Sequence, residues 1–457
     1  MNNKSVSTLV LCLAFFCTIP VFAGPAAPAD YVQIHNGKFV LHGKPFVMRG
    51  TNYFGAWLYP QTIDAGNGIE HATIWSLYHD WDSRKTASEF GFLRSQLRAT
   101  AVRIGTPEKA GFDPMVKYHD WQPWFEPDGS ITESYKKKLV ELADTAQASG
   151  IRIHLCLLWG VGPEMGRNPD DFAPGATMDR FYSNQVRTIG QALRDHPGVM
   201  SYSIGNEVLV LWPSNYYHHT AFEGRAAAFI RRRLHELRTV APYQLLTDDE
   251  GAGPPNKDLW HAPDPDLALL SDPAEGQGTQ PFRLADELDY LGTHWYPESL
   301  KPEDCRDDAF APKIADAVQK LEDYMIVAKA TDKPVVVNEF GLPPDAKKIS
   351  QTDYERVRDQ YYQAFLGACE KNGVQGLLTW VSVPRFVLRP GDWALTPSTL
   401  NQYSPFELDI HNSSRRILFY DPNWDLFVWT GKGDTPEPTP AAKAIASSWS
   451  HIPLPRR

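Results

Sequence analysis

Cysteine is scarce in this sequence, which has five in 457 residues. Two of them, Cys12 and Cys17, lie within the first 23 residues, so Cys156, Cys305 and Cys369 remain for the rest of the chain. Three cysteines allow at most one disulfide, which excludes a scaffold held together by disulfides. Cys156 lies in an apolar run and is expected to be a small buried hydrophobe. Whether Cys305 and Cys369 pair stays open.

Positive charge is also in short supply. Lys and Arg number 45 against 55 Asp and Glu, which gives a formal net charge of −10 and a sequence pI near 5.8. The triplet Arg231-Arg232-Arg233 falls in a helical pattern and is expected to form a solvated face. Nucleic acid and anionic membranes are therefore not expected as partners.

Long apolar runs are missing beyond the N-terminus. Residues 1–23 resemble a secretory signal peptide, with Lys4 at the charged start, an apolar region from Leu9 to Ile19, and Val21-Phe22-Ala23 as the small-residue cleavage site. The apolar region is too short to span a bilayer comfortably. We therefore expect a soluble mature chain that is secreted or periplasmic, and a monomer.

Motifs for metal catalysis are absent as well. The sequence contains no His-Glu-x-x-His motif and no cysteine pair at zinc-binding spacing. His218-His219 and Asp248-Asp249-Glu250 are expected in loops, as solvated or substrate-contacting groups rather than metal ligands. We expect no metal and no cofactor.

The sequence does contain a regular alternation of apolar, β-branched runs with helical patterns. Gly150 and Gly373 are natural helix ends before two of these runs. The alternation predicts a (β/α)8 TIM barrel. The expected strands are Pro45–Asn52, Ala101–Gly105, Ile151–Trp159, Val199–Glu207, Tyr243–Thr247, Leu288–Tyr296, Pro334–Glu339 and Val374–Val381. The expected helices include Glu133–Ser149, Met178–Asp195, Ala221–Val240, Ile314–Ala330, Asp353–Lys371 and Pro440–Trp449.

A single domain is expected from residue 31 to residue 457, after a short linker over 24–30. Alternating apolar residues around Asn36-Gly37 predict a β-hairpin that closes the bottom of the barrel. The chain is much longer than the roughly 250 residues of a typical barrel, so long loops should cover the catalytic face. Residues 384–438 are expected to be such a loop or a small β insertion before the last helix. The other long loops are expected over 57–83, 106–129, 208–219 and 248–286.

Two glutamates stand at the ends of predicted strands. Glu207 follows Asn206 at the end of the fourth strand, and Glu339 follows Asn338 at the end of the seventh. Those two strands face each other across a barrel mouth, and two opposed carboxyl groups are what acid–base chemistry on a glycosidic bond requires. One such glutamate is as often a structural ion-pair partner, but two in matching positions favour catalysis.

Other side chains are expected at the same mouth. Arg103, on the second strand, could hold a carboxylate ionised through charge-assisted hydrogen bonds. His294 and Tyr296 lie two residues apart on one strand, so both should point the same way. Trp380, near the end of the eighth strand, could form the floor of a sugar subsite. Each alone is more often structural, but their convergence favours a site.

These motifs resemble those of clan A glycoside hydrolases, and most closely family 5, the group of endo-β-mannanases and cellulases. The resemblance covers nearly the whole mature chain but is specific only at the strand ends, in FVLHGKPFVMRGTNYF, GNE, HWYP and VVVNEFG. It implies a retaining enzyme in which Glu207 is the acid/base and Glu339 the nucleophile. It also implies that Asn206 binds the sugar 2-hydroxyl.

The resemblance implies further substrate contacts. Tyr296 and Arg103 would lie beside the nucleophile, and His294 would line the same subsite. The remaining expected substrate contacts are Trp380, which would stack under the sugar, and Trp159, Trp212 and Asn52.

The sequence departs from the family pattern in places. Val208 follows Glu207, where family 5 commonly has proline, and Trp159 stands where many members place a histidine, with His154 too early in its strand. The run from His196 to Glu207 also resembles family 2 β-galactosidases and β-glucuronidases, whose N-terminal β-sandwich domains are absent. Substrate and subfamily therefore stay open.

The function expected from the sequence is retaining hydrolysis of a β-linked polysaccharide or oligosaccharide, most like that of an endo-β-1,4-mannanase. The long loops could instead block one end of the cleft and make an exo-acting β-glycosidase, and a β-glucanase of the same clan is a further alternative. A non-catalytic carbohydrate-binding barrel is the alternative from another class. It would be expected to lack one of the two acids, and both are present.

Overall fold

The structure is a computed structural model of the chain. The residues it describes are 28–53, 83–106, 124–158, 173–206, 220–249, 271–272, 282–297, 300–306, 308–329, 331–342, 349–380, 384–386, 426–429 and 437–455. The predicted signal peptide, Glu207, Trp159, Trp212 and most of each predicted long loop lie outside these ranges.

Eight parallel strands form the centre of the molecule. They lie side by side in the order β11-β12-β13-β4-β5-β6-β7-β8. Between β8 and β11 the sheet is joined at Asp289, whose backbone N–H donates to the Leu246 carbonyl at 2.8 Å and whose carboxylate accepts the Leu246 N–H at 2.7 Å. The predicted (β/α)8 fold is confirmed. The strands are β4 (Met48–Asn52), β5 (Ala101–Gly105), β6 (Arg152–Leu158), β7 (Val199–Asn206), β8 (Leu245–Asp249), β11 (Leu291–Trp295), β12 (Val335–Phe340) and β13 (Gly376–Thr379).

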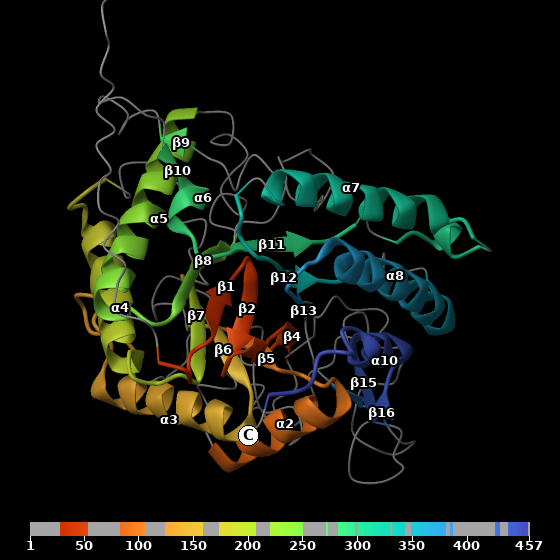
Figure 1. The fold of residues 1–457 in the computed structure, drawn as a ribbon, viewed down its shortest axis with the longest axis horizontal. Helices are drawn as coiled ribbons and strands as arrows, with labels where there is room; N and C mark the ends of the chain where they lie inside the picture. Colours follow the sequence, from red (N-terminus) through yellow and green to blue (C-terminus); the bar gives the residue numbers. More distant parts are fainter. Residues whose placement is uncertain are drawn as a thin grey trace, which may run out of the picture.

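Helices surround the strands (Figure 1). The helix over Glu133–Ser149 has the predicted bounds: Thr132 accepts the Tyr135 N–H at its start, and Gly150, at φ 70°, ends it in the left-handed conformation. α2 is not among the helices that the apolar patterns named. The helices are α2 (Ser83–Gln96), α3 (Glu133–Ser149), α4 (Thr177–Leu193), α5 (Thr220–Val240), α6 (Leu284–Glu287), α7 (Ala311–Lys329), α8 (Gln351–Asn372), α10 (Pro440–Ser447) and the short 3-10 helix η4 (Pro302–Cys305).

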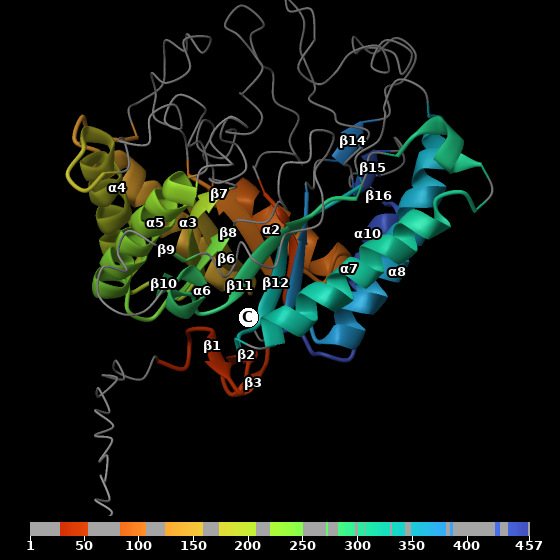
Figure 2. The ribbon, with the colours of Figure 1, turned by 90° about the horizontal axis from the view of Figure 1, so that it is seen from above.

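The predicted hairpin closes one end of the barrel. It consists of β1 (Gln33–His35), β2 (Lys38–Leu41) and β3 (Lys44–Pro45), with Asn36 and Gly37 both at positive φ in the β1–β2 turn. Phe39 packs edge-on against Tyr290 at the start of the sixth barrel strand, with ring centroids 5.3 Å apart. The hairpin lies beneath the strand starts (Figure 2), so the strand ends form the open mouth.

The fifth barrel strand corrects one prediction. β8 runs to Asp249, whereas Asp248 and Asp249 are expected in a solvated loop. Both side chains are buried, at 3% and 0% exposure. Aspartate is depleted in strands, so its appearance after Leu245-Leu246-Thr247 is read as the end of the strand. The burial is made possible by partners from other strands, described below.

Smaller elements complete the described structure. β14 (Pro384–Phe386), β15 (Phe427–Trp429) and β16 (Glu437–Pro438) form a three-stranded sheet, and β9 (Ser271–Asp272) pairs with β10 (Phe282–Arg283). The ring of Phe427 packs edge-on against the ring of Phe92 in α2, with the ring centroids 4.8 Å apart.

The three cysteines of the described chain are free thiols. Cys156 is buried, as predicted for a small hydrophobe in a strand, and Cys305 and Cys369 are not paired with each other. Among the helices that the structure describes, none has the length and apolar character to cross a membrane.

Candidate active site

The strand ends bring six of the predicted site residues to one end of the barrel. Asn52 ends β4, Arg103 lies on β5, Asn206 ends β7, and Glu339 lies on β12, while His294 of β11 lies beside β12. Tyr296 follows β11 directly and reaches Glu339. All six side chains are buried or nearly so, with Glu339 at 5% exposure.

Arg103 lies at the centre of this arrangement. Its Nη1 donates to Glu339 Oε1 at 2.5 Å and to Asn52 Oδ1 at 2.8 Å, and its Nη2 donates to Asn206 Oδ1 at 2.6 Å. Its Nε donates to Asp249 Oδ2 at 2.8 Å. A planar guanidinium presents N–H groups in fixed directions, so one side chain aligns groups from four other strands.

Both oxygens of Glu339 have donors. Arg103 contacts Oε1, while the Tyr296 hydroxyl donates to Oε2 at 2.7 Å and His294 Nδ1 lies 3.5 Å from the same oxygen. Donors of this kind stabilise the ionised form of a carboxylate. Glu339 is therefore held as a charged group at the barrel mouth, which is the state a nucleophile needs.

His294 is held neutral. Burial lowers the pKa of His294 to about 4, against the opposing pull of the Glu339 charge, and the positive charge of Arg103 adds to the lowering. At neutral pH the His294 imidazole therefore contacts Glu339 as a neutral ring. The cation that contacts the Glu339 carboxylate is Arg103.

Asp249 forms a second buried ion pair under Arg103. Besides the contact with Arg103 Nε, Asp249 Oδ2 lies 2.8 Å from His154 Nε2, and Oδ1 accepts from Asn338 Nδ2. Burial alone would raise the pKa of Asp249, but His154 and Arg103 outweigh it and hold that pKa well below its usual range. Asp249 is thus a charged carboxylate in a fully buried place.

Asp248 behaves in the opposite way. Its Oδ1 accepts the Gly205 N–H at 3.1 Å, and Oδ2 has no hydrogen-bond partner among the described residues. Burial, and then the charge of Asp249, raise the pKa of Asp248 to about 8. Two adjacent aspartates therefore carry different protonation states at neutral pH.

The other predicted residues divide into two groups. Asn52 Nδ2 donates to the Asn338 carbonyl at 3.1 Å and to the Thr379 carbonyl at 3.0 Å, so Asn52 ties three strands together and supports Arg103. Trp380 follows β13 and is half-buried, and its backbone N–H donates to the Phe340 carbonyl at 2.9 Å, next to Glu339. Glu207, Trp159 and Trp212 lie outside the described residues.

Sequence reasoning missed the supporting layer of the site. His154, which the sequence places too early in its strand for the mouth, lies 2.8 Å from Asp249, 2.9 Å from Ser201 and 3.2 Å from Tyr290. The alternation of side chains along a strand could have indicated the burial of Asp249, because Leu245, Thr247 and Asp249 share one side of β8.

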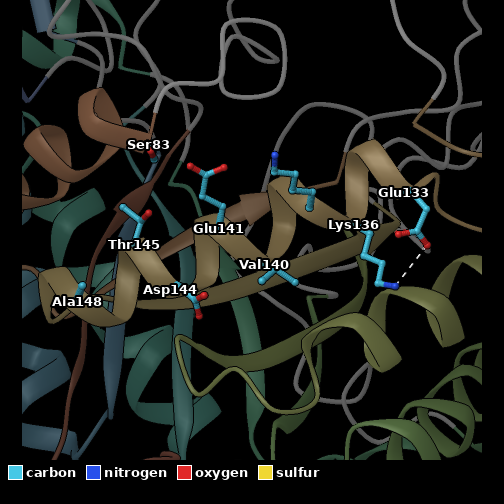
Figure 3. A pocket seen from close by; sticks show the side chains of 9 residues that line it. Ser83, Glu133, Lys136, Val140, Glu141, Asp144, Thr145 and Ala148 are labelled. Atoms are coloured by element: carbon cyan, nitrogen blue, oxygen red, sulfur yellow. Dashed lines mark hydrogen bonds and ion pairs between the residues drawn. The ribbon is translucent and has the colours of Figure 1, made fainter.

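A metal centre, or a groove elsewhere among the described residues, would be an alternative to this arrangement. No group of three or more His, Cys, Asp or Glu that could hold a metal ion occurs in the part of the chain that the structure describes. A surface groove runs along α3 beside Ser83 (Figure 3), where Lys136 pairs with Glu133 at 3.3 Å. Its described lining is a mixture of charged and small side chains without an aromatic ring, unlike a sugar subsite.

Sequence comparisons agree with the strand-end motifs. A family model described as GH family 5 beta-mannosidase-like matches residues 277–381, which include His294, Tyr296 and Glu339. Mannan endo-1,4-beta-mannosidase 3 of Arabidopsis thaliana is 20% identical over 377 residues, covering 78% of this chain and 82% of that protein.

Solved structures share the barrel. The exo-beta-1,4-mannosidase Op5Man5 from Opitutaceae bacterium strain TAV5 superposes with a TM-score of 0.55 at 20% identity, over 90% of this chain and 61% of that one. The present chain thus spans less than two thirds of that enzyme's length. A family 5 mannosidase from Rhizomucor miehei gives a TM-score of 0.53 at 15% identity, over 92% and 97%.

The family model and the Arabidopsis relative are those of glycosidases, and the strand-end motifs resemble those of clan A. Within that clan the chain is most like family 5, the family that its GNE, HWYP and VVVNEFG motifs predict.

Proposed function

We propose that this glycosidase hydrolyses β-1,4-mannosidic bonds of mannan or manno-oligosaccharides, with retention of configuration. The observation that carries the proposal is the environment of Glu339. Arg103 and Tyr296 donate to its two oxygens, so the carboxylate is charged, oriented and at the barrel mouth. A charged carboxylate in that position is suited to attack an anomeric carbon.

The reaction proceeds in two displacements. In the first, Glu339 bonds to the anomeric carbon, the glycosidic C–O bond breaks, and Glu207 gives its proton to the departing oxygen. In the second, Glu207 takes a proton from water, the water oxygen bonds to the anomeric carbon, and the ester bond to Glu339 breaks. Glu207 thereby regains its proton and Glu339 its charge.

Asn206 and Trp380 position the sugar. Asn206 Oδ1 accepts from Arg103, which turns the amide nitrogen away from Arg103 and leaves it to donate to the sugar 2-hydroxyl. Hydrogen bonds to that hydroxyl strengthen in the transition state. Trp380 lies beside Glu339 at the end of the next strand and supplies an apolar face for the ring.

Mannose as the sugar is supported by the relatives' printed names. The family model is described as beta-mannosidase-like, and Op5Man5 and the Arabidopsis protein are named for β-1,4-mannosidic activity. The Arabidopsis protein is named as endo-acting, which fits the expectation from the sequence. The family model and the exo-acting Op5Man5 favour release of mannose from chain ends as the second candidate.

Product analysis separates the two modes. Purified protein is incubated with β-1,4-mannan, glucomannan, cellulose, β-1,3-glucan and aryl β-glycosides, and products are resolved by chromatography during the first few per cent of conversion. A range of manno-oligosaccharides supports endo action, and mannose alone supports exo action. Hydrolysis confined to cellulose or β-1,3-glucan would refute mannoside hydrolysis while leaving a glycosidase.

The two acids are tested by substitution. We expect Glu339→Gln and Glu207→Gln each to abolish hydrolysis, because each loses the charge or the proton that its step needs. Glu322→Gln is the matched control, since Glu322 lies on helix α7 and pairs with Lys371 rather than with any of the predicted site residues. Proton NMR of the first-formed anomer tests retention, and an inverted product would exclude the double displacement.

We also propose that the protein is exported. The support is the charged start, apolar region and small-residue site within residues 1–23. N-terminal sequencing of the protein recovered outside the cytoplasm should begin at Gly24, and an N-terminus at Met1 would contradict export by cleavage.

A further inference from the structure

We propose that Asp249 is a positioning residue for the glycosidase reaction, because it fixes the Arg103 guanidinium in the orientation that serves Glu339 and Asn206. This inference rests on the proposed function. Asp249 has no part in the strand-end motifs, and its fully buried side chain contacts Arg103.

The first argument is the geometry of a planar group. Asp249 Oδ2 accepts from Arg103 Nε at 2.8 Å, on the edge of the guanidinium next to its aliphatic stem. Once Nε is held, the directions of Nη1 and Nη2 are set, because the group is rigid. Those two nitrogens are the ones that reach Glu339 and Asn206, at 2.5 and 2.6 Å.

The second argument is that Asp249 is itself held from several strands. His154 of β6 lies 2.8 Å from Oδ2, and Asn338 of β12 donates to Oδ1. Gly292 of β11 leaves the room for this contact. A Cβ at that position would collide with Asn338 Nδ2 and come within 2.8 Å of Asp249 Oδ1. The Asp249 carboxylate is therefore held in a fixed position by its neighbours, as a residue that orients an active-site group must be.

The third argument is charge. Arg103 stands between two buried carboxylates, so Asp249 takes up part of its positive charge and moderates its action on Glu339. The other described titratable groups around Asp249 are His154, His294, Tyr290, Cys156 and the neighbouring Asp248. Those facing Glu339 among the described residues are Arg103, His294 and Tyr296.

Removing the charge of Asp249 should leave the Arg103 guanidinium less fixed in orientation, and should leave its positive charge no longer shared between two carboxylates. In Asp249→Asn we expect kcat to fall by about a hundredfold, the order of one lost preorganised electrostatic interaction, while KM changes less than about threefold. We also expect the acid limb of the kcat/KM profile to move to lower pH by about one unit, since the unshared cation favours the ionised nucleophile.

Ser201→Ala is the matched control. Ser201 bonds His154 and Tyr290, at 2.9 and 3.0 Å, so it belongs to the same buried network but does not touch Arg103. It should lower the thermal midpoint and leave the acid limb in place. If Ser201→Ala moves the limb as far as Asp249→Asn, the effect is one of general packing and the proposal is wrong.

A second variant covers the case in which Asp249→Asn does not fold. Gly292→Ala keeps every polar group and pushes Asn338 and Asp249 aside with one methyl group, so it should reproduce the fall in kcat and the shift of the acid limb in the same direction. A folded variant of either kind with wild-type kcat and an unmoved limb overturns the proposal.

The parent enzyme separates the two proposals. If the wild-type enzyme hydrolyses the substrate and Glu339→Gln does not, the proposed function is upheld, whatever the result for Asp249→Asn. A parent that cleaves none of the β-glycosides refutes the proposed function and this inference with it.

Discussion

The hydroxyl of Tyr296 donates to Glu339 Oε2 at 2.7 Å, from the opposite side of the carboxylate to Arg103, which contacts Oε1 at 2.5 Å. Tyr296 comes from the segment after β11 and Arg103 from β5, so Glu339 is held between elements that are distant in the chain. A neutral donor and a cationic donor thereby share one carboxylate, and their contributions can be separated by substitution.

Tyr296→Phe removes only the neutral donor. We expect kcat to fall by roughly tenfold to a hundredfold, because a hydrogen bond to a charged group contributes about 1.5–3 kcal/mol. The acid limb of kcat/KM should move to higher pH, since the ionised form of Glu339 loses a donor. Steady-state kinetics across pH measure both effects. Tyr362→Phe removes a hydroxyl group from a buried tyrosine of α8 and is the control. It should leave the acid limb of the kcat/KM profile unchanged.

Arg103→Lys tests whether shape matters as well as charge. A lysine ammonium has three donors on one atom and cannot reach Asp249, Asn52, Asn206 and Glu339 together. We expect a fall in kcat of about a hundredfold or more and a loss of about 3–5 kcal/mol in unfolding free energy, because buried partners are left unpaired. Urea unfolding and kinetics on the same preparation measure the two losses. Near-wild-type values for both would mean that a point charge suffices.

Much of the barrel is predictable from the sequence because its strands are short apolar runs that end in marked residues. β5 and α3 have the predicted bounds, and Asn206 and Glu339 lie at the strand ends where the spacing puts them. The positions follow from local periodicity and from the parallel arrangement, which brings all strand ends to one side.

The supporting layer is not predictable in this way. Asp249 reads as a loop residue because a lone aspartate in a buried strand is unfavourable. Its burial is possible because Arg103, His154 and Asn338 supply charge and hydrogen bonds from distant parts of the chain. No local pattern contains those three partners. The contact becomes visible only when the strands are assembled.

Phe39→Ala tests the role of the hairpin. Phe39 is fully buried and packs edge-on against Tyr290 beneath the barrel, on the side away from Glu339. We expect a loss of about 3–5 kcal/mol in unfolding free energy, as for other buried phenylalanine truncations. The KM of the folded enzyme should stay unchanged, because the site is at the other end of the strands. Urea unfolding and KM at a temperature well below the midpoint are the measurements, and a changed KM without lost stability would contradict this division.

Asp248→Asn should change how stability depends on pH. Burial and the Asp249 charge raise the pKa of Asp248 to about 8, against an ordinary value of 3.8. Between those values the folded protein keeps a proton that the unfolded chain has lost, so this group's contribution to stability is complete below the lower value and declines as pH rises toward the higher one.

Asparagine removes that titration and can still accept the Gly205 N–H. The unfolding free energy of Asp248→Asn relative to wild type should therefore rise between pH 5 and pH 8, by an amount on the order of a few kcal/mol. Urea unfolding at several pH values measures it. Asp323→Asn, at an exposed position of α7, is the control and should run parallel to wild type. A constant difference between Asp248→Asn and wild type over this range would mean that Asp248 is ionised in the folded protein.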